Sequence, residues 1–161
     1  PLYVRIARGG DNVITQKYKP KIGKALTLKK AKDYYFITTG ITTHNALKAC
    51  HFLKKKENID CGVVHFSTIK PLDKNKLKLL IKNSKKIITV EENVKSGGFG
   101  SSILEFSSEL NGNMKSKANI KIIGLKDKFV EKYGTQEELL EYSGLGFKEL
   151  SKQMKNFIKD K

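Results

Sequence analysis

The order of hydrophobic and polar positions predicts strands that alternate with helices. Four short apolar runs, rich in β-branched residues and without a clean alternation, are typical of strands covered on both faces. These predicted strands are residues 34–39, 61–66, 86–90 and 119–125. Apolar residues recur at helical spacing between them, and two more helices are predicted at about residues 135–142 and 147–159.

Capping residues indicate where the helices begin. The first helix should begin near Thr42 or Thr43, because either hydroxyl could cap it. Asp73 is suited to cap the second helix, which we expect to end at about Asn83. A glycine-rich run over residues 96–101 leads into the third helix.

The alternation of strands and helices predicts an α/β fold. We expect a three-layer αβα sandwich around a mainly parallel five-stranded sheet. The fifth strand, residues 24–30, is more polar than the others, so it should be an antiparallel edge strand. Upstream, residues 2–7 alternate like a separate strand. Residues 9–23 are rich in turn formers and predict a linker between two bodies.

The charge of the chain is strongly positive and unevenly distributed. The 161 residues carry 32 Lys and Arg against 16 Asp and Glu, a net charge of +16, and all but two of the 32 are lysine. Residues 1–90 alone hold 20 basic and 5 acidic side chains. Such a half could attract nucleic acid, anionic membrane or phosphorylated metabolites.

Specific nucleic-acid binding is nevertheless disfavoured. Base recognition favours arginine and stacking aromatic residues, and both are scarce here. A solvated lysine surface is the simpler interpretation. A nucleic-acid binder would instead show steep salt dependence, with protection centred on residues 17–32 and 70–86.

Other classes are limited by run length and cysteine content. No apolar run approaches the roughly 18–20 residues that a membrane span needs, so we expect no membrane partner. Two cysteines cannot form a disulfide framework, which favours the cytoplasm or an organelle with a reducing interior. The opening Pro-Leu-Tyr-Val-Arg suggests the interior of a longer polypeptide.

The segment from the third strand to the following helix holds the main candidate site. The run Gly97-Gly98-Phe99-Gly100-Ser101 offers backbone N–H groups at a helix start, which could bind an anion or could simply form a tight turn. It lacks the spacing of a P-loop or a dinucleotide fingerprint. Glu91 and Glu92 should point to opposite faces of the strand, so they cannot act as an acid–base pair, but one could accept hydrogen bonds from loop amides.

A metal or hydrolase site is not predicted. The candidate ligands lack a tight metal-binding spacing, and the two cysteines read as core residues. These candidates are His44, Cys50, His51, Cys61 and His65. A Ser-His-Asp triad has no GxSxG motif to start from.

Arg5 and Arg8 stand out in a chain that otherwise uses lysine. Two arginines at one strand end suggest a need for planar, bidentate geometry. Arg8 stands where the strand stops and Gly9-Gly10 begins. It could clamp a phosphate or carboxylate, or form an interdomain salt bridge, and the residues alone leave both open.

Six segments together resemble the C-terminal part of transketolase-family enzymes. That group includes transketolase, deoxyxylulose-phosphate synthase and the beta subunits of 2-oxoacid dehydrogenases, and the chain looks most similar to the synthase or to a split transketolase-like C-terminal subunit. The segments are Tyr3–Gly9, Ile22–Ala25, Ile37–Gly40, Thr68–Asp73, Val90–Asn93 and Gly97–Ser101. Asn93 favours a resemblance to the synthase over one to the dehydrogenase subunits. The Arg-Ile-Ala-Arg-Gly-Gly stretch, however, differs from the synthase's usual Tyr-Pro-Arg-Gly.

The resemblance implies a domain organisation and a chemistry. Residues 1–8 would be the last strand of a preceding pyrimidine-binding domain, residues 9–23 a linker, and residues 24–161 the transketolase C-terminal-like domain. The intact enzyme would use thiamine diphosphate and magnesium to transfer a two-carbon ketol or acyl unit to a sugar phosphate. Its cofactor would lie between two N-terminal domains, so this chain alone would bind none, hold no catalytic residue and be inactive.

The resemblance also implies roles for particular residues and partners. Arg8 matches the arginine that contacts the substrate phosphate. The partners would be the N-terminal thiamine-binding domains or subunit, with a homodimer as the assembly. The candidate anion or interface loop comprises Glu91, Glu92, Asn93, Gly97, Gly98, Gly100 and Ser101. The alternative is a free-standing regulatory module that binds a phosphate or nucleotide at the Gly97–Ser101 helix start.

Overall fold

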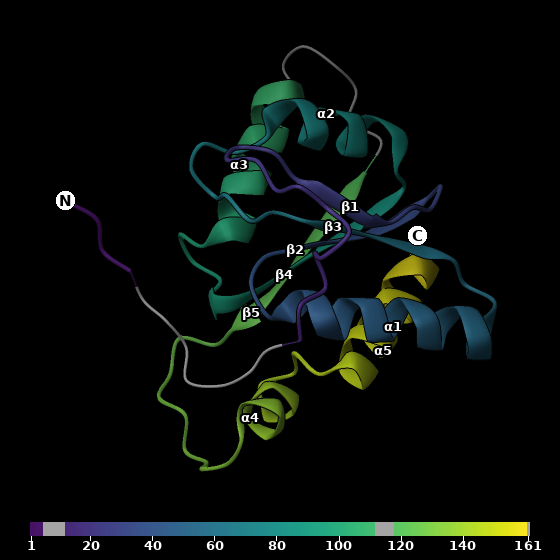
Figure 1. Ribbon diagram of the computed structural model, residues 1–161. Coiled ribbons are helices and arrows are strands. Elements are labelled where there is room, and N and C mark those ends of the chain that lie inside the picture. Colours follow the sequence, from purple (N-terminus) through teal and green to yellow (C-terminus); the bar gives the residue numbers. More distant parts are fainter. Residues whose placement is uncertain (5–11, 112–117, 161) are drawn as a thin grey trace.

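The fold is a five-stranded sheet between two layers of helices (Figure 1). The computed structural model describes residues 1–4, 12–111 and 118–160. The elements are β1 (Leu26–Lys29), β2 (Tyr34–Thr38), α1 (Thr42–Glu57), β3 (Cys61–His65), α2 (Lys74–Asn83), β4 (Lys86–Val94), α3 (Phe99–Asn111), β5 (Asn119–Leu125), α4 (Gln136–Tyr142) and α5 (Phe147–Lys159). The predicted three-layer α/β fold is confirmed.

The strand order β1-β3-β2-β4-β5 makes the sheet mainly parallel. β2 pairs in parallel with β3 and with β4, and β4 pairs in parallel with β5. β1 is antiparallel to β3, with Leu26 opposite His65, so the predicted antiparallel edge strand is confirmed. The four parallel strands therefore end on one side of the sheet, where β1 begins. We call this side the carboxyl edge.

The core forms two layers, one on each face of the sheet. α1 and α5 cover one face, whereas α2 and α3 cover the other (Figure 1). In β2, Phe36 belongs to the first layer and Ile37 to the second, and neither side chain is exposed. Burial on both faces explains why the strands read as continuous apolar runs in the sequence.

Asp73 caps α2, as predicted, and also holds β1 in place. One of its carboxylate oxygens accepts the Lys76 N–H at 3.0 Å, and the other accepts the Ala25 N–H at 3.0 Å. The side chain is buried. A single carboxylate thus joins the start of a helix to the residue before the edge strand.

Replacing Asp73 with alanine should lower the free energy of unfolding by about 1–3 kcal/mol, because a helix cap is lost and the Ala25 N–H loses its partner. Urea denaturation of the wild type and of Asp73→Ala measures this loss. Asp73→Asn keeps one acceptor oxygen and should fall between the two. A loss below about 0.5 kcal/mol for Asp73→Ala would contradict the dual role.

The predicted start of α1 at Thr42 is confirmed, but its predicted threonine cap and the predicted end of β4 are wrong. The N-cap of α1 is Ile41, without a side-chain cap, and the Thr42 and Thr43 hydroxyls donate to the carbonyls of Thr39 and Gly40 at 2.7 and 2.9 Å. Gly40 has a φ of +56°, which turns the chain before either threonine. β4 continues to Val94 instead of ending at residue 90, because Val94 pairs with Leu125 beyond an irregularity in the ladder.

The N-terminal region is described only in part. Residues 2–4 of the predicted strand 2–7 are exposed and lie in no strand, and residues 5–7 are outside the described residues. Residues 12–25 contain no helix or strand. The Tyr18 hydroxyl donates to the Thr27 carbonyl at 3.2 Å and so fixes this segment against β1. The proposed domain boundaries remain predictions.

Within the described residues, none of the helices is both long enough and apolar enough to span a membrane.

Candidate functional site

Glu91 is a buried carboxylate at the carboxyl edge. Its side chain is 1% exposed, near the end of β4. One oxygen accepts the Phe99 N–H at 2.7 Å and the other accepts the Gly100 N–H at 2.8 Å. These two amides open α3, where the helix has unpaired donors and a partial positive charge. The expectation that one glutamate accepts hydrogen bonds from loop amides is confirmed.

Close contacts at Gly98 and Gly100 and a positive φ at Gly97 explain the glycine-rich run. A Cβ atom at Gly98 would lie 2.3 Å from a Glu91 carboxylate oxygen and 2.6 Å from the Val94 carbonyl. A Cβ atom at Gly100 would lie 2.7 Å from the Thr89 hydroxyl. Gly97 has a φ of +69°, a conformation that side chains rarely adopt. The loop is therefore built to bring α3 against the carboxylate.

The remaining residues of the predicted loop face outward. Glu92 and Asn93 are exposed, so the prediction that the two glutamates point to opposite faces is confirmed. The Asn93 side-chain oxygen accepts the Val94 N–H at 2.9 Å, and the Ser101 hydroxyl donates to the Lys95 carbonyl at 2.7 Å. These two polar side chains stabilise the turn itself.

The start of α3 is therefore capped by a carboxylate of this chain. The donors that the phosphate- or nucleotide-binding alternative required, the Phe99 and Gly100 amides, are already hydrogen-bonded to Glu91. An incoming phosphate would also meet the buried glutamate. This geometry argues against the free-standing anion-binding module.

A second polar cluster lies where β2 and β3 end. The Thr43 hydroxyl lies 2.9 Å from the Thr38 hydroxyl and 2.9 Å from His65 Nδ1. Burial, followed by the charge of His44, lowers the pKa of His65 below its ordinary value of 6.5. This contact has no signal in the sequence, where Thr43 and His65 are 22 positions apart and His65 is a candidate only for the metal site that is not predicted.

The lowered pKa of His65 predicts a pH dependence of stability. The unfolded chain binds a proton at this residue near pH 6.5, whereas the folded chain binds it at lower pH, so stability falls as the pH drops below that value. The midpoint of thermal unfolding should therefore decrease between pH 7.5 and 5.5, and His65→Asn should reduce that decrease. Scanning calorimetry at both values checks this, and equal decreases for both proteins would contradict it.

The candidate metal ligands do not converge. In the part of the chain that the structure describes, no three His, Cys, Asp or Glu side chains come close enough to hold a metal ion. Cys50 and Cys61 are buried free thiols, as predicted for core residues. The hydrogen bond with the Cys61 thiol, followed by burial, raises the pKa of Cys50, which keeps this thiol protonated.

Sequence reasoning missed a cavity at the carboxyl edge. It has a volume of about 750 Å³ and lies between the end of β5, the segment after it, and the facing ends of α4 and α5. Its lining combines apolar and charged side chains, among them Leu125, Phe129, Tyr142, Lys148 and Gln153. Residues 126–135 have no regular periodicity, so the sequence offered no signal for this cavity.

Arg8, the predicted phosphate-binding residue, lies outside the described residues.

Comparisons with known proteins give a consistent family. The family model described as transketolase, C-terminal domain, matches residues 23–150. The chain is 35% identical to the 1-deoxy-D-xylulose-5-phosphate synthase of Clostridium perfringens over 147 residues, which is 90% of this chain and 23% of that protein. It is 38% identical to the synthase of Syntrophus aciditrophicus over 141 residues, 86% of this chain and 21% of that protein.

Solved structures agree with this result. A structure titled split gene transketolase, inactive beta4 tetramer, superposes with a TM-score of 0.77 at 28% identity, covering 92% of this chain and 46% of that one. The Campylobacter jejuni transketolase shares the fold, with a TM-score of 0.53 at 21% identity, covering 89% of this chain and 20% of that one.

The fold and the match over residues 23–150 define a transketolase C-terminal domain. The chain belongs to the transketolase family, and its homologues include 1-deoxy-D-xylulose-5-phosphate synthases. It spans about a quarter of the length of these curated relatives.

Proposed function

We propose that this chain is the C-terminal domain or subunit of a thiamine diphosphate-dependent enzyme that transfers a two-carbon ketol or acyl unit to a sugar phosphate, as deoxyxylulose-phosphate synthase does. The observation that carries the proposal is the 35% identity to such a synthase along 90% of the chain. In this role the domain serves assembly and positions the phosphate of the substrate. Bond-making takes place in the N-terminal domains.

The described residues do not fit a site for thiamine diphosphate and magnesium. Both oxygens of Glu91, the most buried carboxylate described, are hydrogen-bonded to the amides of α3. No cluster of three candidate metal ligands forms among the described residues. We therefore assign no step of the chemistry to them and place the cofactor in the N-terminal domains.

Arg8 is proposed as the contact to the substrate phosphate in the assembled enzyme. Support comes from the resemblance of its segment to the family and from the chemistry of a guanidinium, which binds phosphate oxygens with two parallel hydrogen bonds. Its position before the linker would place it between this domain and the preceding one. When the reacting end of a sugar-phosphate substrate reaches the cofactor, its phosphate group would lie at this boundary between the two domains.

The proposed partners are the N-terminal thiamine-binding domains or subunit of the same enzyme, with a homodimer as the assembly. A related split-gene transketolase was solved as an inactive tetramer of its beta chain, which supports the view that such a piece needs a partner for activity. The two free thiols fit the reducing interior that we propose as its location.

Calorimetry tests whether this chain alone binds the cofactor or the substrates. The isolated chain is titrated with thiamine diphosphate and magnesium, and separately with nucleotides and sugar phosphates. We expect no binding at micromolar concentration in any titration, and no turnover when cofactor and substrates are present together. Tight binding of thiamine diphosphate, or turnover by the chain alone, would contradict the proposal, and tight binding of a nucleotide would revive the regulatory module.

A further inference from the structure

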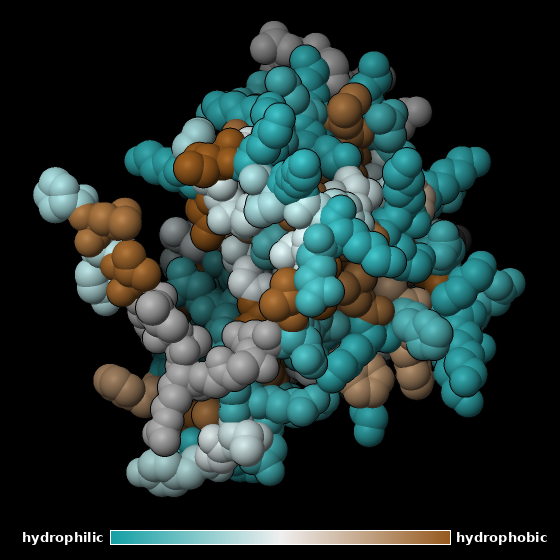
Figure 2. All heavy atoms as spheres, in the orientation of Figure 1, coloured by the Kyte–Doolittle hydropathy of each residue, from teal (hydrophilic) through white to brown (hydrophobic). Residues whose placement is uncertain are grey.

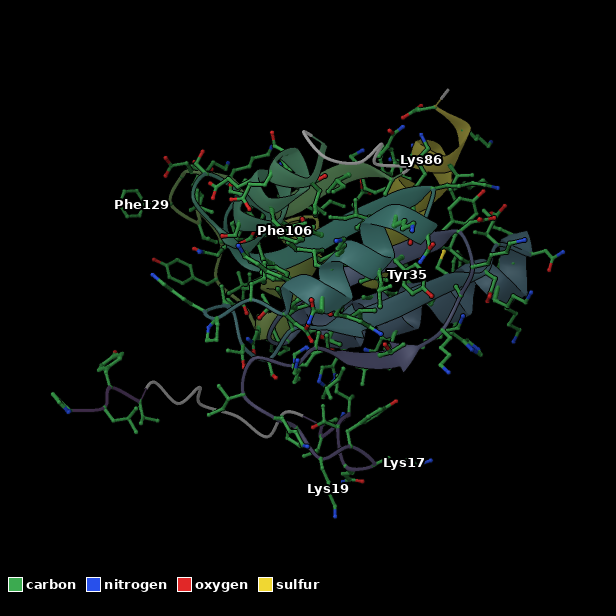
Figure 3. All side chains as sticks on the ribbon, turned by 90° about the horizontal axis from the view of Figure 1, so that it is seen from above. Lys17, Lys19, Tyr35, Lys86, Phe106 and Phe129 are labelled. Atoms are coloured by element: carbon green, nitrogen blue, oxygen red, sulfur yellow. The ribbon has the colours of Figure 1, made fainter. Side chains whose placement is uncertain are left out.

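The exposed apolar side chains gather at one side of the domain. Beyond residue 13, the described large apolar residues that are exposed all lie at the carboxyl edge, except Leu79 on α2 and Leu104 on α3. Phe129 is 95% exposed and Tyr133 is fully exposed, and both lie in the segment that follows β5. Phe129 projects away from the body in Figure 3. Exposed apolar clusters of this kind mark interaction surfaces.

Further exposed apolar residues lie along the same edge of the sheet. Val130 lies in the same segment, and Tyr142 at the end of α4 lines the cavity beneath it. At the other end of the edge, Ile22 and Ile69 are also exposed, and the Gly23 N–H donates to the Thr68 hydroxyl at 3.0 Å, which brings their two loops together. We call the set Ile22, Ile69, Phe129, Val130, Tyr133 and Tyr142 the edge surface.

The N-terminal residues lie on the same side of the molecule. Figures 1 and 3 both place residues 1–4 toward the end that carries the segment after β5, away from the C-terminus. Figure 2 shows hydrophobic side chains projecting on this side. Leu2, Tyr3 and Val4 are themselves exposed apolar residues. A domain joined to this chain through that segment would therefore lie next to the edge surface.

We propose that the edge surface is the docking site for the preceding thiamine-binding domain, an inference that rests on the function proposed above. The occupant follows from the length of the relatives, of which this chain covers 23%, and from the direction of the N-terminal segment. The partner inserts an apolar side chain into the cavity of about 750 Å³ under Phe129.

A pair of double variants tests the surface. Phe129→Ser with Tyr133→Ser removes two exposed rings from the edge, whereas Leu79→Ser with Leu104→Ser removes two exposed apolar side chains from α2 and α3 as a matched control. Affinity for the separately produced N-terminal region of the same enzyme is measured by calorimetry with thiamine diphosphate and magnesium present. We expect the edge variant to bind at least about tenfold more weakly, and the control to bind like the wild type. Thermal unfolding of the two variants should match, because all four side chains are exposed.

The outcomes separate the two proposals. If the wild type binds the N-terminal region and the edge variant binds equally well, the docking site is overturned while the proposed function stands. If the wild type does not bind, both fail. A self-dimer of this chain that the edge variant dissociates, with unchanged affinity for the N-terminal region, would assign the surface to a second copy and overturn the proposal. In the intact enzyme, amides 126–135 should exchange deuterium more slowly than in the isolated chain, and equal exchange would also overturn it.

Discussion

Replacing Glu91 with alanine is expected to lower the free energy of unfolding by about 3–5 kcal/mol. The Phe99 and Gly100 amides would be left buried without a partner, each at a cost of about 1–3 kcal/mol. The negative charge that stabilises the start of α3 would be lost as well. Guanidinium denaturation of the purified domain measures the change.

The neighbouring glutamate provides a matched control. Glu92 has the same chemistry but is exposed, so Glu92→Ala should change the free energy of unfolding by less than about 0.5 kcal/mol. Glu91→Gln keeps the shape and one acceptor oxygen, and should lie between wild type and Glu91→Ala. If Glu91→Ala costs less than about 1 kcal/mol, the carboxylate does not hold α3 as the geometry indicates.

Replacing Arg8 with glutamine in the intact enzyme is expected to lower kcat/KM for the sugar-phosphate substrate by about 10- to 100-fold, mainly through a higher KM. Loss of charge-assisted hydrogen bonds to a phosphate has an effect of this size. Kinetics with the phosphorylated substrate and with its dephosphorylated analogue measure the effect, which should be much smaller for the analogue.

Arg5 is the control for Arg8, because it is the other arginine of the same segment. Arg5→Gln should leave kcat/KM for the phosphorylated substrate nearly unchanged, and Arg8→Lys should restore part of the loss by supplying a cation without the bidentate geometry. Equal losses for the phosphorylated substrate and its analogue would show that Arg8 acts structurally, as an interdomain salt bridge would.

Much of the fold could be predicted because its determinants are local. The strands at residues 34–38 and 61–65 are buried on both faces, and this leaves a continuous apolar run that is visible in the sequence. Residues 24–30 are more polar because β1 lies at the edge of the sheet and is only partly buried. This polar composition was enough to predict an edge strand. Asp73 was identified as a cap because its residue type and its position at a helix start are enough to assign the contact.

The remainder depends on contacts between distant residues. Alternation along β4 predicts that Glu91 and Glu92 point to opposite faces of the sheet. Which of them faces inward is decided by the packing of α3 and of Gly124 on β5. A Cβ atom at Gly124 would lie 3.2 Å from the Glu91 side chain. The Thr43–His65 contact joins residues 22 positions apart. The cavity forms only where β5, α4 and α5 come together. None of these has a signature in a single stretch of sequence.

The most direct test of the account is reconstitution of activity. The N-terminal region of the enzyme, with thiamine diphosphate and magnesium, is titrated with this chain, and transfer of the two-carbon unit to a sugar phosphate is followed. The account predicts that neither part is active alone and that activity rises and saturates at an equal ratio of the two chains. Full activity of the N-terminal region without this chain, or turnover by this chain alone, would contradict it.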